Sequence, residues 1–267
     1  MINAIKRVEY TISTKKVTNP AAKVRLLLIT DLHSSLSGEK QKKVLEQIYR
    51  WNPDAVLLAG DMIASKEPQK TVYTIEFITE LCRYYPVFYE NGNHESRWKC
   101  KESAMHTFYE DYKQCLQEAG VCFLENQSAE LTIRGQKLVI HGLELHLDYY
   151  KRTRHNQLDV KVINTLLGKC SQDAYHILLA HSPKFWKAYA SWGADLTLCG
   201  HYHGGFLRIG KQGVISPYLE LFPAYSYGQF DVGKRHMIVS SGAGDHCFSV
   251  RIGNSREIVG IQLVPEI

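Results

Sequence analysis

The sequence predicts an α/β fold, and three observations lead to this prediction. Short apolar runs of strand length alternate along the chain with amphipathic segments of helix length, as in folds where strands and helices follow one another in turn. The runs consist almost entirely of Leu, Ile and Val, which is typical of strands buried on both faces of a sheet. The length of 267 residues suits one large α/β domain, so we expect residues 1–267 to form a single domain.

Each expected element follows from this alternation. The strands are expected at 24–30, 55–59, 87–89, 138–142, 175–180, 196–199 and 237–240. The helices are expected at about 38–51, 68–84, 103–119, 158–168 and 184–192. Ser182 and Pro183 suit the N-cap and first position of the last helix, and Gly120 and Gly193 suit the positions just after a helix end.

Two stretches do not fit one element each. Residues 142–157 and 204–230 lack a regular period. Long irregular segments in α/β enzymes often contact the substrate. The second stretch is rich in aromatic residues and could form an apolar lip for a lipid or a nucleobase, although packed loop aromatics are the more common finding.

Composition and charge narrow the class of protein. Hydrophobic residues make up 45% of the chain and charged residues 22%, as in ordinary globular proteins. A formal charge of +5 suits an anionic substrate but is too small for a nucleic-acid-binding surface. Seven cysteines without a CxxC pair argue against a disulfide framework. With no signal peptide and no apolar run of membrane-spanning length, we expect a cytoplasmic protein whose membrane contact, if any, is peripheral.

Residues that can bind metals follow five of the expected strands. Because the carboxyl ends of strands in an open α/β sheet border a common crevice, residues far apart in the sequence can converge there. Carboxylate, amide and imidazole groups without a thiolate suit Mn, Fe or Zn. The five segments are Asp31-Leu32-His33, Gly60-Asp61, Asn91-Gly92-Asn93-His94, His181 and Gly200-His201-Tyr202-His203.

In this order, the blocks DLH, GD, GNHE, a lone His and GHYH resemble the signature of the calcineurin-like metallophosphoesterases. The resemblance covers about 23–267 and implies a β-sandwich of two sheets flanked by helices, with a dinuclear metal site at the C-terminal ends of the strands. GHYHGG at 200–205 and RIGN at 251–254 further resemble a branch of bacterial phosphodiesterase-like proteins and UDP-diacylglucosamine hydrolases. Phe206 and Ala64-Ser65 depart from that branch, which leaves the substrate open.

The resemblance also implies roles for individual residues. Two divalent or mixed-valence ions, Mn, Fe or Zn, would be held in a net positive centre that attracts a phosphate. Asp61 would bridge the ions, and His94 would donate a proton to the leaving group. The first ion would be held by Asp31, His33 and His203, and the second by Asn93, His181 and His201.

Other polar residues have two possible roles. His141, His146, His155 and His246 could approach the site, although a lone histidine is more often structural. His106, His176 and His236 are interpreted as structural. The run Lys151–Arg154 could bind a distal phosphate, but a short charge run is usually a solvated surface.

The predicted reaction is hydrolysis of a P–O bond by a hydroxide that bridges the two metal ions. The preferred substrate is a small or lipid-linked phosphate compound, cleaved by a phosphodiesterase or pyrophosphatase activity. The alternatives are a phosphomonoesterase, including a phosphoprotein phosphatase, or a nuclease. A nuclease would need many phosphate contacts, which the modest charge does not favour. The non-enzymatic alternative is a metal-stabilised interaction module.

Overall fold

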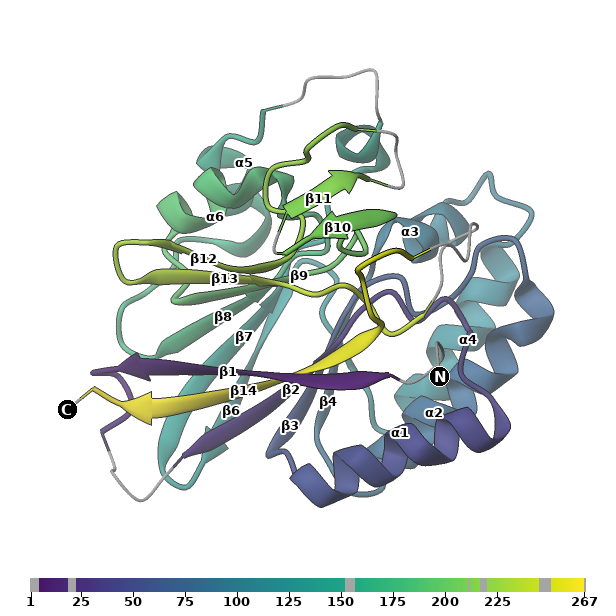
Figure 1. The fold of residues 1–267 in the computed structure, drawn as a ribbon, viewed down its shortest axis with the longest axis horizontal. Helices are drawn as coiled ribbons and strands as arrows, with labels where there is room; N and C mark the ends of the chain where they lie inside the picture. The colour runs from purple at the N-terminus through teal and green to yellow at the C-terminus, as the bar shows by residue number, and fades with distance from the viewer. Residues whose placement is uncertain are drawn as a thin grey trace.

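Two six-stranded sheets pack face to face, and helices cover both outer faces (Figure 1). The computed structural model describes residues 5–18, 23–151, 157–210, 212–216, 220–244 and 251–266, and the strand counts refer to these residues. The arrangement confirms the predicted α/β fold of two sheets flanked by helices.

The first sheet contains the strands that precede three of the predicted metal-binding segments. β2, β3, β4 and β5 run parallel, while β14 runs antiparallel to β2 and parallel to β1. The carboxyl ends of β2, β3 and β4 therefore meet at one edge. In spatial order the strands are β1 (Lys6–Thr14), β14 (Glu257–Pro265), β2 (Val24–Ile29), β3 (Ala55–Ala59), β4 (Val87–Glu90) and β5 (Cys122–Phe123).

The second sheet contains the strands that precede the other two segments. β7, β8, β9 and β13 run parallel, and the antiparallel strands β6 and β12 form its two edges. A separate hairpin is formed by β10 (Leu207–Ile209) and β11 (Gln212–Ile215). In spatial order the sheet contains β12 (Gly228–Val232), β13 (Arg235–Val239), β9 (Leu196–Cys199), β8 (Tyr175–Leu179), β7 (Gln136–Gly142) and β6 (Gln127–Ile133).

The helices belong to three groups. Packed on the first sheet are α1 (Gly38–Trp51), α2 (Thr71–Cys82) and α4 (His106–Glu118), with the short η1 (Pro68–Lys70) before α2. Packed on the second sheet are α5 (Val160–Leu167) and α6 (Trp186–Trp192), with η3 (Pro183–Phe185) before α6. The short helices α3 (Asn93–Lys99) and η2 (Leu147–Tyr150) follow β4 and β7. Among the described residues, no helix is long and apolar enough to cross a membrane.

The core is divided into layers by the alternation of side chains along each strand. In β2, Leu26 and Leu28 belong to the apolar cluster between the two sheets, whereas Leu27 and Ile29 belong to the cluster beneath the helices. Successive residues of a strand point to opposite faces, so a strand covered on both sides must be apolar throughout. This explains the apolar run LLLI at 26–29, which follows the exposed Arg25.

The two predicted helix ends are confirmed, whereas Ser182 and Pro183 begin the short η3 and not α6, which begins at Trp186. Several strands are additional to those predicted. Gly193 adopts φ 112° directly after α6, and Gly120 adopts φ 103° just after α4. The strands β1, β5, β6, β10, β11, β12 and β14 and the helix α3 had not been predicted. Several of these strands are short or lie at sheet edges, where half of the side chains are exposed and the apolar signal is weak.

We propose that residues 1–267 form one folding unit, because the apolar cluster between the sheets joins residues 12 to 263. We expect one cooperative unfolding transition, and a loss of about 2–5 kcal/mol in unfolding free energy for Leu26→Ala, which deletes a buried side chain. The matched control Leu221→Ala alters a side chain that is 67% exposed and should cost less than about 1 kcal/mol. Two separated transitions in urea would contradict the proposal.

Two histidines outside the site, His141 and His176, form a hydrogen-bonded pair in the second sheet. Nε2 of His141 lies 2.9 Å from Nδ1 of His176, and Nδ1 of His141 lies 2.6 Å from the hydroxyl of Ser128. Burial, together with the charge of His176, lowers the pKa of His141 to about 4. The folded protein therefore holds His141 in its neutral form.

A pKa below that of the unfolded chain stabilises the protein above about pH 6.5, and this contribution is lost as the pH falls toward 4. Between pH 7 and pH 5 we expect the unfolding free energy of the natural protein to fall by about 2 kcal/mol more than that of His141→Gln. Urea denaturation at both pH values measures this difference. Equal losses in both proteins would show that His141 does not titrate as described.

Candidate metal centre

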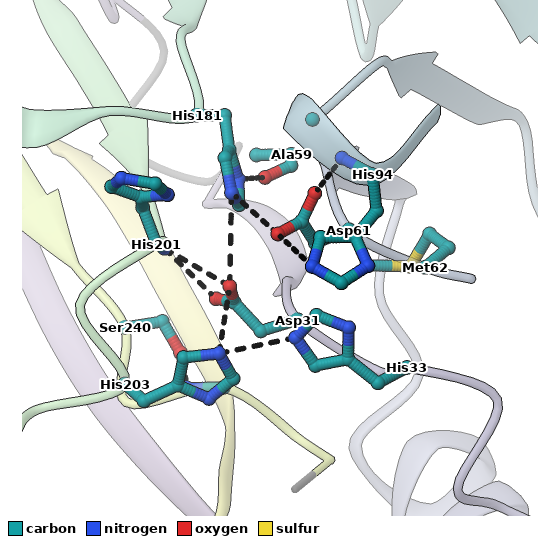
Figure 2. A network of polar contacts seen from close by, with 12 residues as sticks. Asp31, His33, Ala59, Asp61, Met62, His94, His181, His201, His203 and Ser240 are labelled. Carbon is teal, nitrogen blue, oxygen red and sulfur yellow. Dashed lines mark hydrogen bonds and ion pairs between the residues drawn. The ribbon is translucent and has the colours of Figure 1, made fainter. Parts of the chain in front are cut away.

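The structure brings the predicted metal-binding segments together at the edge where the parallel strands of both sheets end. Asp31 and His33 follow β2, Asp61 follows β3 and Asn93 begins α3 after β4, while His181 follows β8 and the pair His201 and His203 follows β9. All seven side chains are buried. Figure 2 shows the carboxylates of Asp31 and Asp61 in the centre, surrounded by the imidazoles of His33, His94, His181, His201 and His203.

The backbone at the strand ends adopts an uncommon conformation. A positive φ is found at Asp31, His33, Asp61, His201 and His203, with values between 48° and 72°. Such residues are infrequent outside glycine and concentrate at functional sites, because the surrounding structure must hold them in place. These turns direct the side chains inward, and no pattern in the sequence predicts them.

Asp31 is held against the turn that carries His201. The backbone N–H of His201 donates to both carboxylate oxygens of Asp31, at 3.0 and 3.2 Å. The turn approaches so closely that a Cβ atom on Gly200 would collide with the Asp31 carboxylate. Glycine at position 200 is therefore required for the contact.

Asp61 is held by the first turn of α3 and by a second acidic residue. The N–H of His94 donates to Oδ1 of Asp61 at 2.8 Å. Behind this contact, the buried carboxylate of Glu95 ties the loop after β3 to the loop after β4. It accepts N–H donors from Asp61, Met62, Ile63 and Gly92 at 2.7–3.1 Å and the hydroxyl of Tyr89 at 2.9 Å. The GNHE motif contains Glu95, but its anchoring role emerges only from the structure.

The backbone orients two of the imidazoles. Nδ1 of His181 lies 2.9 Å from the carbonyl oxygen of Ala59, which must accept its proton, so Nε2 of His181 is left facing the carboxylates. Nε2 lies 3.1 Å from Asp61 Oδ2 and 3.8 Å from Asp31 Oδ1. Nδ1 of His33 likewise approaches the carbonyl of Ile63 at 3.4 Å. Metal-binding histidines commonly use such bonds to fix the ring nitrogen that faces the ion.

His203 is supported by the RIGN run near the C-terminus. Its Nε2 lies 3.1 Å from Nε2 of His33, and a guanidinium nitrogen of Arg251 lies 3.2 Å from its Nδ1. Arg251 also donates to the carbonyls of Ser241 and Gly244, and the side-chain amide of Asn254 donates to the carbonyl of His203. The run therefore secures the GHYH turn, a role that the sequence did not reveal.

His94 contacts both Asp61 and His33. Its Nε2 is 3.9 Å from Asp61 Oδ2, and its ring packs edge-on against His33 with centroids 4.7 Å apart. The backbone N–H of Ser65 donates to Nδ1 of His94 at 3.0 Å. Ser65 stands where the related branch often has an acidic residue, and in this protein its backbone N–H contacts His94.

Potential ligand atoms form three overlapping groups, within each of which they lie no more than 4.8 Å apart. The group Asp31, His33 and His203 contains the ligands predicted for the first ion. The group Asp61, His181 and His201 contains those predicted for the second ion except for Asn93. Both the oxygen and the nitrogen of the Asn93 side chain are buried without a hydrogen-bond partner among the described residues. The groups are Asp31, His33 and His203; His33, Asp61 and His94; and Asp61, His181 and His201.

The charges of the site also suit divalent cations. Burial raises the pKa of Asp31 to about 6 and that of Glu90 well above its usual range, and the charge of nearby Asp61 adds to both shifts. The pKa of Asp61 stays well below its usual range despite its burial, since His181 and His94 lie beside it. A cation between the carboxylates and imidazoles would balance this charge. The residues present therefore fit a pair of divalent ions.

The other candidate residues lie elsewhere. His141 belongs to the pair with His176, and His146 caps η2 and is exposed. The exposed side chain of Lys151 pairs with Asp148 at 2.6 Å. His155, His246, Arg152–Arg154 and Tyr218 lie outside the described residues. In the aromatic stretch, Tyr225 packs edge-on against Phe230, whereas Phe222 is 65% exposed.

Comparison with known proteins identifies the family. A family model described as calcineurin-like phosphoesterase matches residues 24–205. This segment contains all five metal-binding segments. The chain therefore belongs to the calcineurin-like phosphoesterases, which are metal-dependent phosphoric ester hydrolases.

Individual relatives are similar in sequence to most of this chain. The Caenorhabditis elegans protein F40B5.2 is 26% identical over 95% of this chain, which spans only 51% of that relative's length. The Escherichia coli phosphodiesterase YaeI is 23% identical over 91% of this chain and 83% of its own length. The 5′-nucleotidase precursor of Thermus thermophilus has a TM-score of 0.50 at 14% identity, covering 91% of this chain and 54% of that structure. This last likeness concerns the fold alone.

Glu95 provides a test of how the site is held together. In Glu95→Gln, the amide NH₂ would face backbone N–H donors, so the loop after β3 should lose its anchor. We expect metal affinity to fall about 10- to 100-fold, as is typical when a group supporting a ligand is altered. Equilibrium dialysis with Mn²⁺ or Zn²⁺ measures the affinity. Glu110→Gln, on the exposed face of α4, is the matched control, and equal affinities in both variants would refute the anchoring role.

Proposed function

We propose that this protein hydrolyses a P–O bond as a phosphodiesterase or pyrophosphatase acting on a small or lipid-linked phosphate compound. The observation that carries the proposal is that Asp61 belongs to two of the ligand groups, one with His33 and the other with His181. A carboxylate shared in this way suits two neighbouring ions, as used in phosphoryl transfer. Similarity to the phosphodiesterase YaeI supports the preference for a diester.

We assign the two ions, Mn, Fe or Zn, to the ligand sets inferred above, with Asp61 between them. Such ions polarise phosphoryl oxygens and lower the pKa of water to near neutrality. The donor set of carboxylate, amide and imidazole suits these metals. The sets are Asp31, His33 and His203 for one ion and Asn93, His181 and His201 for the other.

His94 is assigned as the hydrogen-bond donor to the leaving oxygen, because its Nδ1 accepts the N–H of Ser65 and its Nε2 carries the ring hydrogen. The N–H of Ser65 occupies Nδ1, so Nε2 is the atom of His94 that can face a substrate. Its neighbour Asp61 holds the His94 backbone in place. A donor fixed in this way loses little orientational freedom when the substrate binds.

We also propose that the protein works in the cytoplasm. Six cysteines in the described part of the chain are free thiols, in agreement with a reducing compartment: Cys82, Cys100, Cys115, Cys122, Cys170 and Cys199.

The proposed function is tested with bis(p-nitrophenyl) phosphate and p-nitrophenyl phosphate as substrates. Protein stripped of metal and resupplied with Mn, Fe, Zn or Mg should cleave the diester faster than the monoester. Asp61→Asn should abolish turnover, and His94→Ala should reduce kcat about 10²- to 10⁴-fold, the range for loss of a general acid. Asp111→Asn, on the exposed face of α4, is the matched control and should retain full activity.

The alternatives give different results in the same assay. Preference for the monoester would favour a phosphomonoesterase. No turnover with any of the metals, together with retained biological function in Asp61→Asn cells, would favour an interaction module. Equal activity in Asp61→Asn and Asp111→Asn would refute the proposed site.

A further inference from the structure

A pocket beside the metal centre is not explained by the chemistry of phosphate hydrolysis. It has a volume of about 480 Å³ and lies between α3, η2 and α5. Pockets of this size suit small organic ligands. Ser96 and Lys99 line it from α3, Leu147 and Tyr149 from η2, and Val162 and Leu166 from α5.

Two walls of this pocket begin at the metal centre. Helix α3 starts with the ligand Asn93, and Ser96 and Lys99 follow at intervals of three residues, which places them on the same side of the helix. At the end of η2, the ring of Tyr150 lies 5.2 Å from that of His201, while the preceding Tyr149 lines the pocket. The pocket therefore shares α3 and η2 with the metal centre.

The charged groups of the pocket are satisfied within the protein. Among the described residues that line it, Lys99 and Glu144 carry opposite charges and lie 2.8 Å apart, and the exposed imidazole of His146 lies 3.4 Å from Asp148. Lys99 also contacts Glu125 at 3.2 Å, and the hydroxyl of Ser96 donates to Glu144 at 3.0 Å. A second phosphate would have to break these contacts and would face the carboxylate of Glu144. The pocket therefore disfavours a charged group.

Apart from Cys100, Asn126 and His146, the remaining lining residues are mainly apolar. Leu145 and Leu147 come from the segment after β7, and Val162 and Leu166 lie one turn apart on α5. The ring of Tyr149 is fixed by an edge-on contact with Phe185, with centroids 5.5 Å apart. A ligand gains binding energy here mainly by removing apolar surface from water.

We propose that this pocket binds an uncharged, mainly apolar ester group of the substrate, which makes the substrate a phosphate ester of an apolar alcohol. This inference rests on the proposed function, because the metal centre must hold the phosphate. It specifies the class of substrate and assigns selectivity to α5 and η2. The irregular segment 142–157 contributes several of the lining residues.

The proposal is tested with n-alkyl p-nitrophenyl phosphates whose alkyl group runs from methyl to hexyl. We expect kcat/KM to rise about threefold per added methylene, mainly through a lower KM, as each methylene leaves water. Calorimetric titration with methyl phosphate and hexyl phosphate measures the same preference without turnover. Hexyl phosphate should bind the metal-loaded protein at least about 30-fold more tightly.

Two variants locate the effect in the pocket. Val162→Trp fills the space and should remove the dependence on chain length. Val72→Trp, on an α2 side chain that is 48% exposed, is the matched control and should keep the dependence. Leu166→Gln preserves side-chain size and should weaken the dependence, which keeps the test valid if Val162→Trp does not fold.

The outcomes separate this proposal from the proposed function. Turnover of the methyl ester with no gain along the series, or an unchanged gain in Val162→Trp and Leu166→Gln, would overturn the pocket assignment while leaving the phosphodiesterase intact. Absence of turnover with tighter binding of hexyl phosphate would contradict the proposed function but support the pocket.

Discussion

The burial of two aspartate carboxylates at the junction of two sheets is the constraint on which the site depends. Asp31 and Asp61 are almost inaccessible to solvent. A buried carboxylate is costly unless hydrogen bonds and opposite charges compensate it. Backbone N–H groups and imidazoles provide part of this compensation. Divalent ions, which the family implies, would supply further positive charge.

This compensation needs a backbone that comes unusually close to the carboxylates. A side chain at Gly92 would collide with Asp61, and one at Gly200 would collide with Asp31. Several ligands also adopt left-handed backbone conformations, each of which costs on the order of 1–3 kcal/mol in a residue other than glycine. The layered core can hold such turns because the strands before them are completely buried. The packed core of the sheets therefore holds the strand-end turns in the conformations that the metal centre requires.

The metal centre and the neighbouring pocket would divide the recognition of a substrate between them. In the proposed function the metal centre would hold a phosphate, whereas Lys99 and Glu144 pair with each other in the pocket. The same fold can serve different functions, because specificity depends on the site and not on the fold. This is consistent with the fold-level likeness to a nucleotidase, which by itself does not indicate a nucleotide substrate.

The sequence by itself determined the α/β class, the buried strands and the segments that meet at the metal centre. These features were readable because a strand covered on both faces must be apolar, and because ligands placed directly after parallel strands share one sheet edge. The roles of individual ligands came from the family resemblance and remain proposals. Edge strands such as β1 and β6 were missed because their alternating, half-exposed side chains give a weak signal.

Only the tertiary structure decided how the site is supported and what lies beside it. Glu95 anchors the Asp61 loop through hydrogen bonds to backbone groups more than 30 residues away, and Arg251 reaches His203 across 48 residues. The pairing of Lys99 with Glu144, which leaves an apolar pocket, joins residues 45 positions apart. Such contacts depend on how the chain packs in three dimensions, and no local pattern of residue types encodes them.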